Sequence, residues 1–167
     1  MNSNPEFVLS CPTIKPGATL PDAQVFNGMG CTGKNLSPAL KWSGAPSGTR
    51  SFAITVYDPD APTGSGWWHW VVYNIPATVN ELPEGAGTPD GKGLPAGCVQ
   101  GRTDFGIPGF GGAAPPPGDK PHRYIFTVYA LKTDKIDIPP DGTAAQVGFM
   151  INATKLGAAS FTAMYGR

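Results

Sequence analysis

The residues best suited to chemistry are the two histidines of the chain and the acids near them. Asp58 and Asp60 stand in the stretch YDPDAP, and His69 follows in WWHW after a short, flexible TGSG. The second histidine, His122, lies two residues before Tyr124 in PHRY. Imidazole, phenol and carboxyl groups can together bind an anion, hold a metal ion or transfer protons. The sequence therefore predicts a polar site if these two stretches meet in the fold.

Three kinds of chemistry fit these residue types. In the first, the imidazoles, the phenol and the backbone N–H groups of Gly111–Ala114 surround a phosphate or carboxylate. An ionised aspartate would oppose that anion unless it is protonated, shares a proton with it, or holds a histidine tautomer. In the second, His69, His122 and one aspartate bind a metal ion. In the third, the cluster is an acid–base or nucleophilic centre, although Ser65 has no elbow motif, which argues against a serine triad.

Each of these residues also has a purely structural explanation. A histidine beside apolar residues is more often a satisfied structural group than a ligand, and an aspartate before proline commonly forms an Asx turn. Trp67, Trp68 and Trp70 are expected in the core, with one of them available as a pocket wall, and Arg123 could pair with a surface acid. The functional interpretation therefore depends on the convergence of both histidines, the acids and a glycine-rich loop.

Three apolar strands are expected to position the site. They are SFAITVY (Ser51–Tyr57), WWHWVVYNI (Trp67–Ile75) and RYIFTVYAL (Arg123–Leu131), all rich in β-branched and aromatic residues. Because they are apolar on both faces, we expect them in the middle of the fold. Side chains alternate along a strand, so the histidine and tyrosine that flank Arg123 share one face. If the strands form one sheet, the polar side chains gather at one of its ends.

The other elements are less strongly patterned. A helix is expected to begin at Thr143, which with Gln146 matches a capping box, and to end near Gly157. The loop Gly106–Pro121 has too many glycines and prolines for regular structure, and a loop of this length in a compact domain favours function. Weaker strands are expected at Phe7–Leu9, Gln24–Phe26, Leu40–Trp42 and Phe161–Tyr165, and a second long loop at Pro83–Gly97. The pattern predicts a mainly β protein with one domain over residues 1–167.

Composition narrows the class of protein. The chain has 167 residues, enough for one domain with a real core, and its 23 glycines and 19 prolines border on low complexity. Apolar residues make up 40% and aromatic residues 10%, which favours a turn-rich β protein over disorder. Lysine plus arginine and aspartate plus glutamate number 12 each, for a formal net charge of zero. That balance argues against nucleic acid or anionic membrane as a partner.

Targeting signals and cysteines leave the compartment open. No apolar run approaches the roughly 18 residues that span a bilayer. The N-terminus, MNSNPEF, lacks the basic and apolar parts of a signal peptide, so we expect a cytoplasmic protein, or a periplasmic one without its leader. Cys11, Cys31 and Cys98 have no CxxC spacing, which argues against zinc and leaves open both one disulfide and three thiols.

Three stretches resemble the phosphatidylethanolamine-binding protein family, the group that includes Raf kinase inhibitor protein and the plant flowering regulators. They are FNGMGCTGKNLSP (Phe26–Pro38), GTRSFAITVYDPDAPTGSGWWHWVVYNIPA and GAAPPPGDKPHRYIFTVYAL, within a likeness that runs from about Phe7 to Tyr165. The bacterial, Raf-kinase-inhibitor-like branch is the most similar. The resemblance implies an antiparallel β-sandwich with one or two peripheral helices and a small cavity for phosphate and similar anions. The ligand-binding residues that it implies are Asp58, Asp60, Pro62, His69, Gly112, Pro115, Pro116, His122 and Tyr124.

Two departures from the eukaryotic pattern limit what the resemblance implies. Ala114 stands where those members carry a glycine, and the chain stops at Arg167 without their C-terminal helix, which argues against phospholipid binding and kinase inhibition. The leading hypothesis is a regulatory, non-enzymatic module that binds a small phosphorylated or carboxylated ligand without metal or cofactor. The alternative is a hydrolase-type or metal-assisted enzyme that uses the same cluster. A third hypothesis makes the pocket vestigial and the surface functional, for instance as a homodimer.

Overall fold

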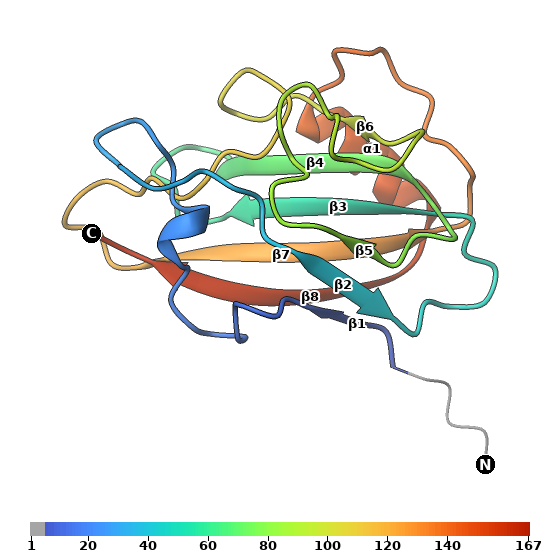
Figure 1. Cartoon of the computed structure of the whole chain (residues 1–167). Helices are drawn as coiled ribbons and strands as arrows, with labels where there is room; N and C mark the ends of the chain where they lie inside the picture. The colour runs from blue at the N-terminus through green and yellow to red at the C-terminus, as the bar shows by residue number, and fades with distance from the viewer. Residues whose placement is uncertain (1–5) are drawn as a thin grey trace.

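The computed structural model describes residues 6–167 and contains two antiparallel β-sheets and one α-helix (Figure 1). The larger sheet has the strand order β6-β4-β3-β7-β8 and the smaller one β1-β2-β5. The elements are β1 (Val8–Ser10), the 3-10 turn η1 (Asp22–Gln24), β2 (Leu40–Ser43), β3 (Ser51–Asp58), β4 (Trp67–Pro76), β5 (Glu81–Leu82), β6 (Val99–Gln100), β7 (His122–Leu131), α1 (Ala144–Thr154) and β8 (Lys155–Tyr165). The predicted mainly β, antiparallel class is confirmed. Residues 1–5, which bear on the signal-peptide expectation and on the start of the predicted domain, lie outside the described residues.

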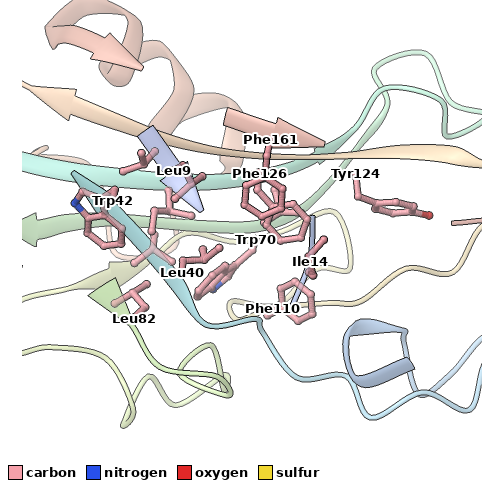
Figure 2. Close-up of a cluster of buried hydrophobic side chains, with 14 of the residues drawn as sticks. Leu9, Ile14, Leu40, Trp42, Trp70, Leu82, Phe110, Tyr124, Phe126 and Phe161 are labelled. Carbon is pink, nitrogen blue, oxygen red and sulfur yellow. The ribbon is translucent and has the colours of Figure 1, made fainter. Parts of the chain in front are cut away.

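The three strongly apolar strands form the centre of the larger sheet, as predicted. Strand β3 pairs with β4 on one side and with β7 on the other. One face of the sheet packs against the smaller sheet through a cluster that includes Trp42, Trp70 and Phe126 (Figure 2). The opposite face packs against α1, where Val71 and Val147 belong to a second buried cluster. Cover on both faces explains why these strands carry almost no polar residues except at their ends.

Strand β4 has one extra residue beside the end of β3. Val56 pairs with Trp70 and Tyr57 pairs with Trp68, so His69 lies between the two pairs without a partner of its own. Such a β-bulge locally changes the alternation of side chains and is common next to functional sites. As a result, His69 and Trp70 both point to the side of the smaller sheet, while Trp68 stacks on Tyr57 on the other side.

The helix begins as predicted but ends earlier. Thr143 and Gln146 form both hydrogen bonds of the capping box. The helix stops at Thr154, and the chain continues directly into β8, which pairs with β7 over its whole length. Gly157 is therefore a strand residue and not a helix stop: a Cβ atom there would lie 3.0 Å from Cγ of Pro46. The predicted helix end was wrong because the backbone groups that follow Thr154 are used by the β7 ladder.

The weak strand predicted at Gln24–Phe26 was also wrong. Residues Asp22–Gln24 form a 3-10 turn, after which Val25 makes only a single parallel bridge to Ala113. Gln24 is fully buried, and among the described residues neither polar atom of its side chain has a hydrogen-bond partner. The other three weak strands are present with shifted bounds, as β1, β2 and β8.

Two general features of the chain bear on its class. Within residues 6–167, no helix combines the length and the apolar character needed to cross a membrane. Cys11, Cys31 and Cys98 are all free, so the structure matches the three-thiol alternative. Burial raises the pKa of the Cys98 thiol to about 11, which makes it a poor nucleophile at neutral pH.

Candidate functional site

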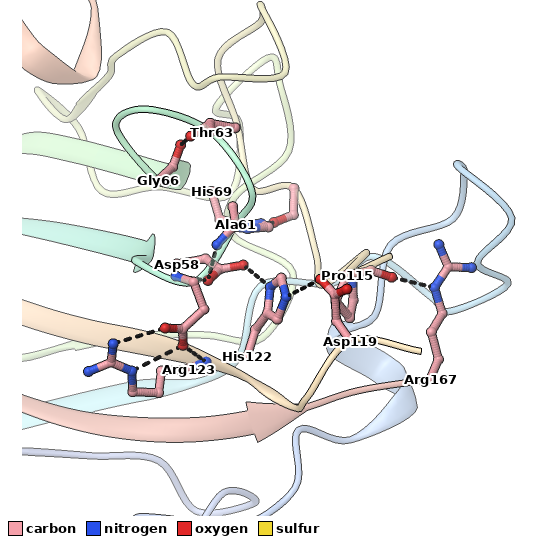
Figure 3. A network of polar contacts seen from close by, with 12 residues as sticks. Asp58, Ala61, Thr63, Gly66, His69, Pro115, Asp119, His122, Arg123 and Arg167 are labelled. Atoms are coloured by element: carbon pink, nitrogen blue, oxygen red, sulfur yellow. Dashed lines mark hydrogen bonds and ion pairs between the residues drawn. The ribbon is translucent and has the colours of Figure 1, made fainter. Parts of the chain in front are cut away.

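The predicted polar residues meet at one end of the larger sheet, where β3 ends and β4 and β7 begin (Figure 3). A cavity of about 170 Å³ opens there, smaller than the roughly 300–1,000 Å³ typical of sites for drug-sized ligands. Its walls come from the three strand ends, the turn after β3 and two loops. The lining residues are Met29, Asp58, Ala61, Pro62, Thr63, Trp67, His69, Phe105, Ala114, Pro115, Pro116, His122 and Tyr124. Of the predicted ligand-binding residues, only Asp60 and Gly112 lie outside this lining.

Asp58 is buried and fully engaged within the protein. Its Oδ1 accepts hydrogen bonds from the backbone N–H groups of Asp60 at 2.8 Å and Ala61 at 3.1 Å, which closes an Asx turn. Its Oδ2 lies 2.7 Å from Nδ1 of His122. Of the roles considered for the aspartate, this contact fits the last in part: Asp58 holds the orientation of the His122 ring.

His122 lies between two carboxylates, one of which the sequence did not reveal. Asp119, in the loop before β7, places Oδ2 at 2.9 Å from Nε2 of the ring (Figure 3). Burial lowers the pKa of His122, but the hydrogen bonds to Asp58 and Asp119 outweigh it, and the net shift is upward. Both ring nitrogens of His122 therefore have a carboxylate partner, and neither nitrogen is left to meet a ligand.

We expect this arrangement to make the free energy of unfolding depend on pH above about 6.5, the ordinary pKa of histidine. Because the pKa of His122 is higher in the folded state than its ordinary 6.5, the stabilisation is complete below that pH. It is lost as pH rises through the raised value. Urea unfolding of the wild type and of His122→Gln between pH 5.5 and 9 measures this. Parallel pH profiles for the two proteins would contradict the expectation.

His69 and Tyr124 contribute buried polar atoms to the lining of the cavity. Nδ1 of His69 lies 2.8 Å from the carbonyl oxygen of Gly111, which can only accept, so Nδ1 carries the proton. Among the described residues, Nε2 of His69 and the hydroxyl of Tyr124 are buried and have no partner. Burial lowers the pKa of His69 and raises that of Tyr124, so both side chains are neutral near pH 7. The rings contact each other edge to face at 5.2 Å.

Asp60 and Gly112 act behind the cavity wall. Asp60 accepts hydrogen bonds from the guanidinium and the backbone N–H of Arg123, so Arg123 does pair with an acid, as considered from the sequence. Those bonds lower the pKa of Asp60 to about 2. The backbone N–H of Gly112 donates to Oδ1 of Asn35 at 2.7 Å, which ties the glycine-rich loop to the chain after η1. Both residues therefore hold wall segments in place.

The loop wall is also braced by Arg167. Its guanidinium donates to the carbonyl oxygens of Pro115 at 2.6 Å and Met29 at 2.9 Å, and its own carbonyl accepts from the N–H of Gly118.

The sequence did not predict Met29 and Phe105 as lining residues, since nothing in their local pattern separates them from ordinary loop residues. Asp119 had one available signal, its place three residues before a site histidine.

The donor arrangement does not favour a metal ion. Within residues 6–167, no three His, Cys, Asp or Glu side chains come together in a group that could hold one. The reason lies in the trio itself: Asp58 and Asp119 bind opposite edges of the His122 ring, so their oxygens do not converge on one point.

Comparison with known proteins identifies the family of the chain. The family model for phosphatidylethanolamine-binding protein matches residues 10–166. The UPF0098 proteins YbcL and YbhB of Escherichia coli are 59% identical over 159 residues and 53% identical over 152 residues. These matches cover 95% of this chain and 87% of YbcL, and 91% of this chain and 95% of YbhB.

Solved structures show the same fold. The crystal structure of Escherichia coli YbcL superposes with a TM-score of 0.95 at 58% identity and covers 98% of this chain and 99% of that one. A homologue from Chlamydia trachomatis gives a TM-score of 0.80 at 29% identity, with 99% of each chain covered. The chain belongs to the phosphatidylethanolamine-binding protein family, in its bacterial YbcL/YbhB branch.

Proposed function

We propose that this protein is a binding module that takes up a small oxyanion, such as a phosphate or phosphoryl group, in the cavity beside His69 and Tyr124. The observation that carries the proposal is the pair of buried polar atoms without partners, Nε2 of His69 and the Tyr124 hydroxyl, in residues that line one cavity. Leaving such groups unpaired costs about 1–3 kcal/mol each, so a ligand that bonds both gains that amount.

The lining of the cavity fits a small ligand in which the acidic group carries an apolar substituent. The lining includes buried polar residues, among them Asp58, His69 and Tyr124, and apolar side chains, among them Met29, which is 62% exposed. Phe105, another lining residue, contacts both Trp67 and His69 edge to face. An acid group beside the buried polar residues would place its substituent against the apolar side chains, where a hydrocarbon or aromatic group is favoured. We further propose that ligand occupancy regulates a protein partner.

The Tyr124 hydroxyl offers the sharpest test. Tyr124→Phe removes only the unpartnered hydroxyl, so we expect the affinity for phosphate and phenyl phosphate to fall about tenfold or more, because a hydrogen bond to a charged group is lost. The stability of the fold should stay the same or rise slightly. Titration calorimetry at pH 7 measures the affinity, and urea unfolding measures the stability.

Tyr129→Phe is the matched control. Tyr129 lies on the same strand, five residues on, and packs with the cluster on the α1 side. Removing the hydroxyl of Tyr129 should leave the affinity for phosphate and phenyl phosphate unchanged. Equal affinities for wild type and Tyr124→Phe, or no measurable binding to the wild type, would overturn the proposed function.

A further inference from the structure

We propose that Asn27 is a site of spontaneous modification, at which the backbone nitrogen of Gly28 attacks the side-chain amide and converts the asparagine into isoaspartate or aspartate. The two residues stand in FNGMG (Phe26–Gly30), in the loop after η1, and Asn27 is the only asparagine of the chain that is followed by glycine. The proposal is independent of the proposed function, because it concerns the covalent chemistry of this loop and not the ligand of the cavity.

The reaction needs only these two residues and water. The nitrogen of Gly28 loses its proton to hydroxide and forms a bond to Cγ of Asn27, and the amide nitrogen leaves as ammonia with a proton from water. The product is a five-membered succinimide ring. Water then opens the ring at one of its two carbonyl carbons. Opening at the side-chain carbonyl gives aspartate, whereas opening at the backbone carbonyl gives isoaspartate, whose main chain is one carbon longer.

Both reacting groups are accessible in the folded protein. Asn27 is exposed and Gly28 is half-buried. Within residues 6–167, neither the amide of Asn27 nor the backbone N–H of Gly28 is hydrogen-bonded. Glycine has no Cβ atom and adopts a wide range of backbone conformations, so the nitrogen can approach Cγ without a steric barrier from its own side chain. The attack therefore needs no unfolding of a neighbouring element.

Two other asparagines have the protection that Asn27 lacks. The side-chain oxygen of Asn35 accepts from the N–H of Gly112 at 2.7 Å, and that of Asn74 accepts from the N–H of Ile136 at 2.7 Å. The backbone nitrogen that follows Asn35 also donates a hydrogen bond, at 2.8 Å. These bonds must break before the same ring can form, so both residues serve as internal controls.

Isoaspartate at position 27 would disturb the wall of the cavity. Phe26 is held on both sides: its N–H donates to the carbonyl oxygen of Ala113, and its own carbonyl oxygen accepts from the N–H of Gly33, each at 2.9 Å. Met29, three residues on, lines the cavity. An additional main-chain carbon between Phe26 and Met29 must shift Met29 or break one of those bonds, so the wall changes as the protein ages.

Aspartate at position 27 would instead change the charge of a second cleft. Asn27 and Lys34 line a cleft of about 180 Å³, and Lys34 is the one charged residue in this lining among the described residues. A new carboxylate there would attract the ammonium group of Lys34. Both products lower the net charge of the chain by one, which ion-exchange chromatography detects.

The experiment ages the purified protein at 37 °C and pH 8.5, digests it at acidic pH and follows the peptides by mass spectrometry. We expect the peptide with Asn27 to gain one dalton at least about tenfold faster than those with Asn35 and Asn74, because hydrogen bonds protect the latter two. The rate should rise with pH between 6 and 9, since the attacking nitrogen must lose its proton. Labelling by an isoaspartyl methyltransferase identifies the isoaspartate product.

Two variants test the partners of the reaction. Asn27→Gln would have to form a six-membered ring, so we expect no mass gain at this position over the same period. Gly28→Ala keeps the asparagine but restricts the backbone, so the rate should fall at least about threefold. Equal rates at Asn27 and Asn35 in the wild type, which needs no variant, would overturn the proposal, and so would an unchanged rate in Gly28→Ala.

Discussion

Replacing Asp58 by alanine is expected to lower the free energy of unfolding by about 3–5 kcal/mol at pH 7, because it removes one partner of a buried ion pair and leaves three donors without their acceptor. Asp58 is 2% exposed. It binds the His122 ring and also accepts from two backbone N–H groups of the turn after β3. All three donors would lose their acceptor together. Urea unfolding of the wild type and the variant measures the effect, and phosphate titration should show that binding is lost with it.

Asp60 in the same YDPDAP stretch supplies the matched control. Its ion pair with Arg123 is partly exposed, and such pairs typically contribute about 0–1 kcal/mol. Asp60→Asn should therefore cost far less than Asp58→Ala, although both remove one carboxylate from the same turn. Similar losses for the two variants would show that the turn, and not the buried bond to His122, carries the stability.

Substituting alanine for Gly112 is the second change with a large expected effect, a loss of about 3 kcal/mol or more. A Cβ atom there would lie 2.3 Å from the carbonyl oxygen of Gln24 and 2.7 Å from the backbone nitrogen of Phe26. Those atoms cannot yield easily, because Ala113 is hydrogen-bonded to the same two residues at 3.2 and 2.9 Å. The loop that carries the cavity wall would be pushed away, so phosphate affinity should fall as well.

Gly148→Ala is a control for which the free energy of unfolding is expected to change in the opposite direction. It lies inside α1, and a Cβ atom there would meet nothing within 4 Å. Gly148→Ala should raise the free energy of unfolding by up to about 1 kcal/mol, since alanine favours a helix interior over glycine. A tolerated Gly112→Ala, with stability close to that of Gly148→Ala, would show that the loop and η1 are not held as closely as the structure indicates.

The sequence predicted the elements whose pattern is set by burial. Strands β3, β4 and β7 are apolar on both faces because both faces are covered, and the alternation around Arg123 correctly placed its neighbours on one buried face. The capping box at Thr143 is a local motif and needs no tertiary context. The site residues Asp58, His69, His122 and Tyr124 could be brought together on paper because each stands at the end of one of these strands.

Other features depend on contacts between distant residues, which no local pattern encodes. Most of the first half of β8 consists of small or exposed residues, KLGAAS, and becomes a strand because β7 offers it a ladder. The engagement of His122 by Asp119 depends on the path of an irregular loop. Met29 and Phe105 reach the cavity from loops that are separated from the site histidines in the sequence. The tautomer of His69 depends on a single carbonyl group, that of Gly111, whose position only the folded chain defines.

The bulge in β4 makes the position of His69 depend on one extra residue in this strand. Because His69 is the residue without a partner opposite β3, a deletion of one residue at this position would let Tyr57 and Val56 face consecutive residues of a regular strand. The two strands would then pair regularly, and the cavity would lose the imidazole of His69. A relative whose alignment shows a one-residue gap within WWHW is therefore expected to keep the architecture without the binding chemistry. In this architecture, function can be gained or lost through an insertion or deletion as readily as through a substitution.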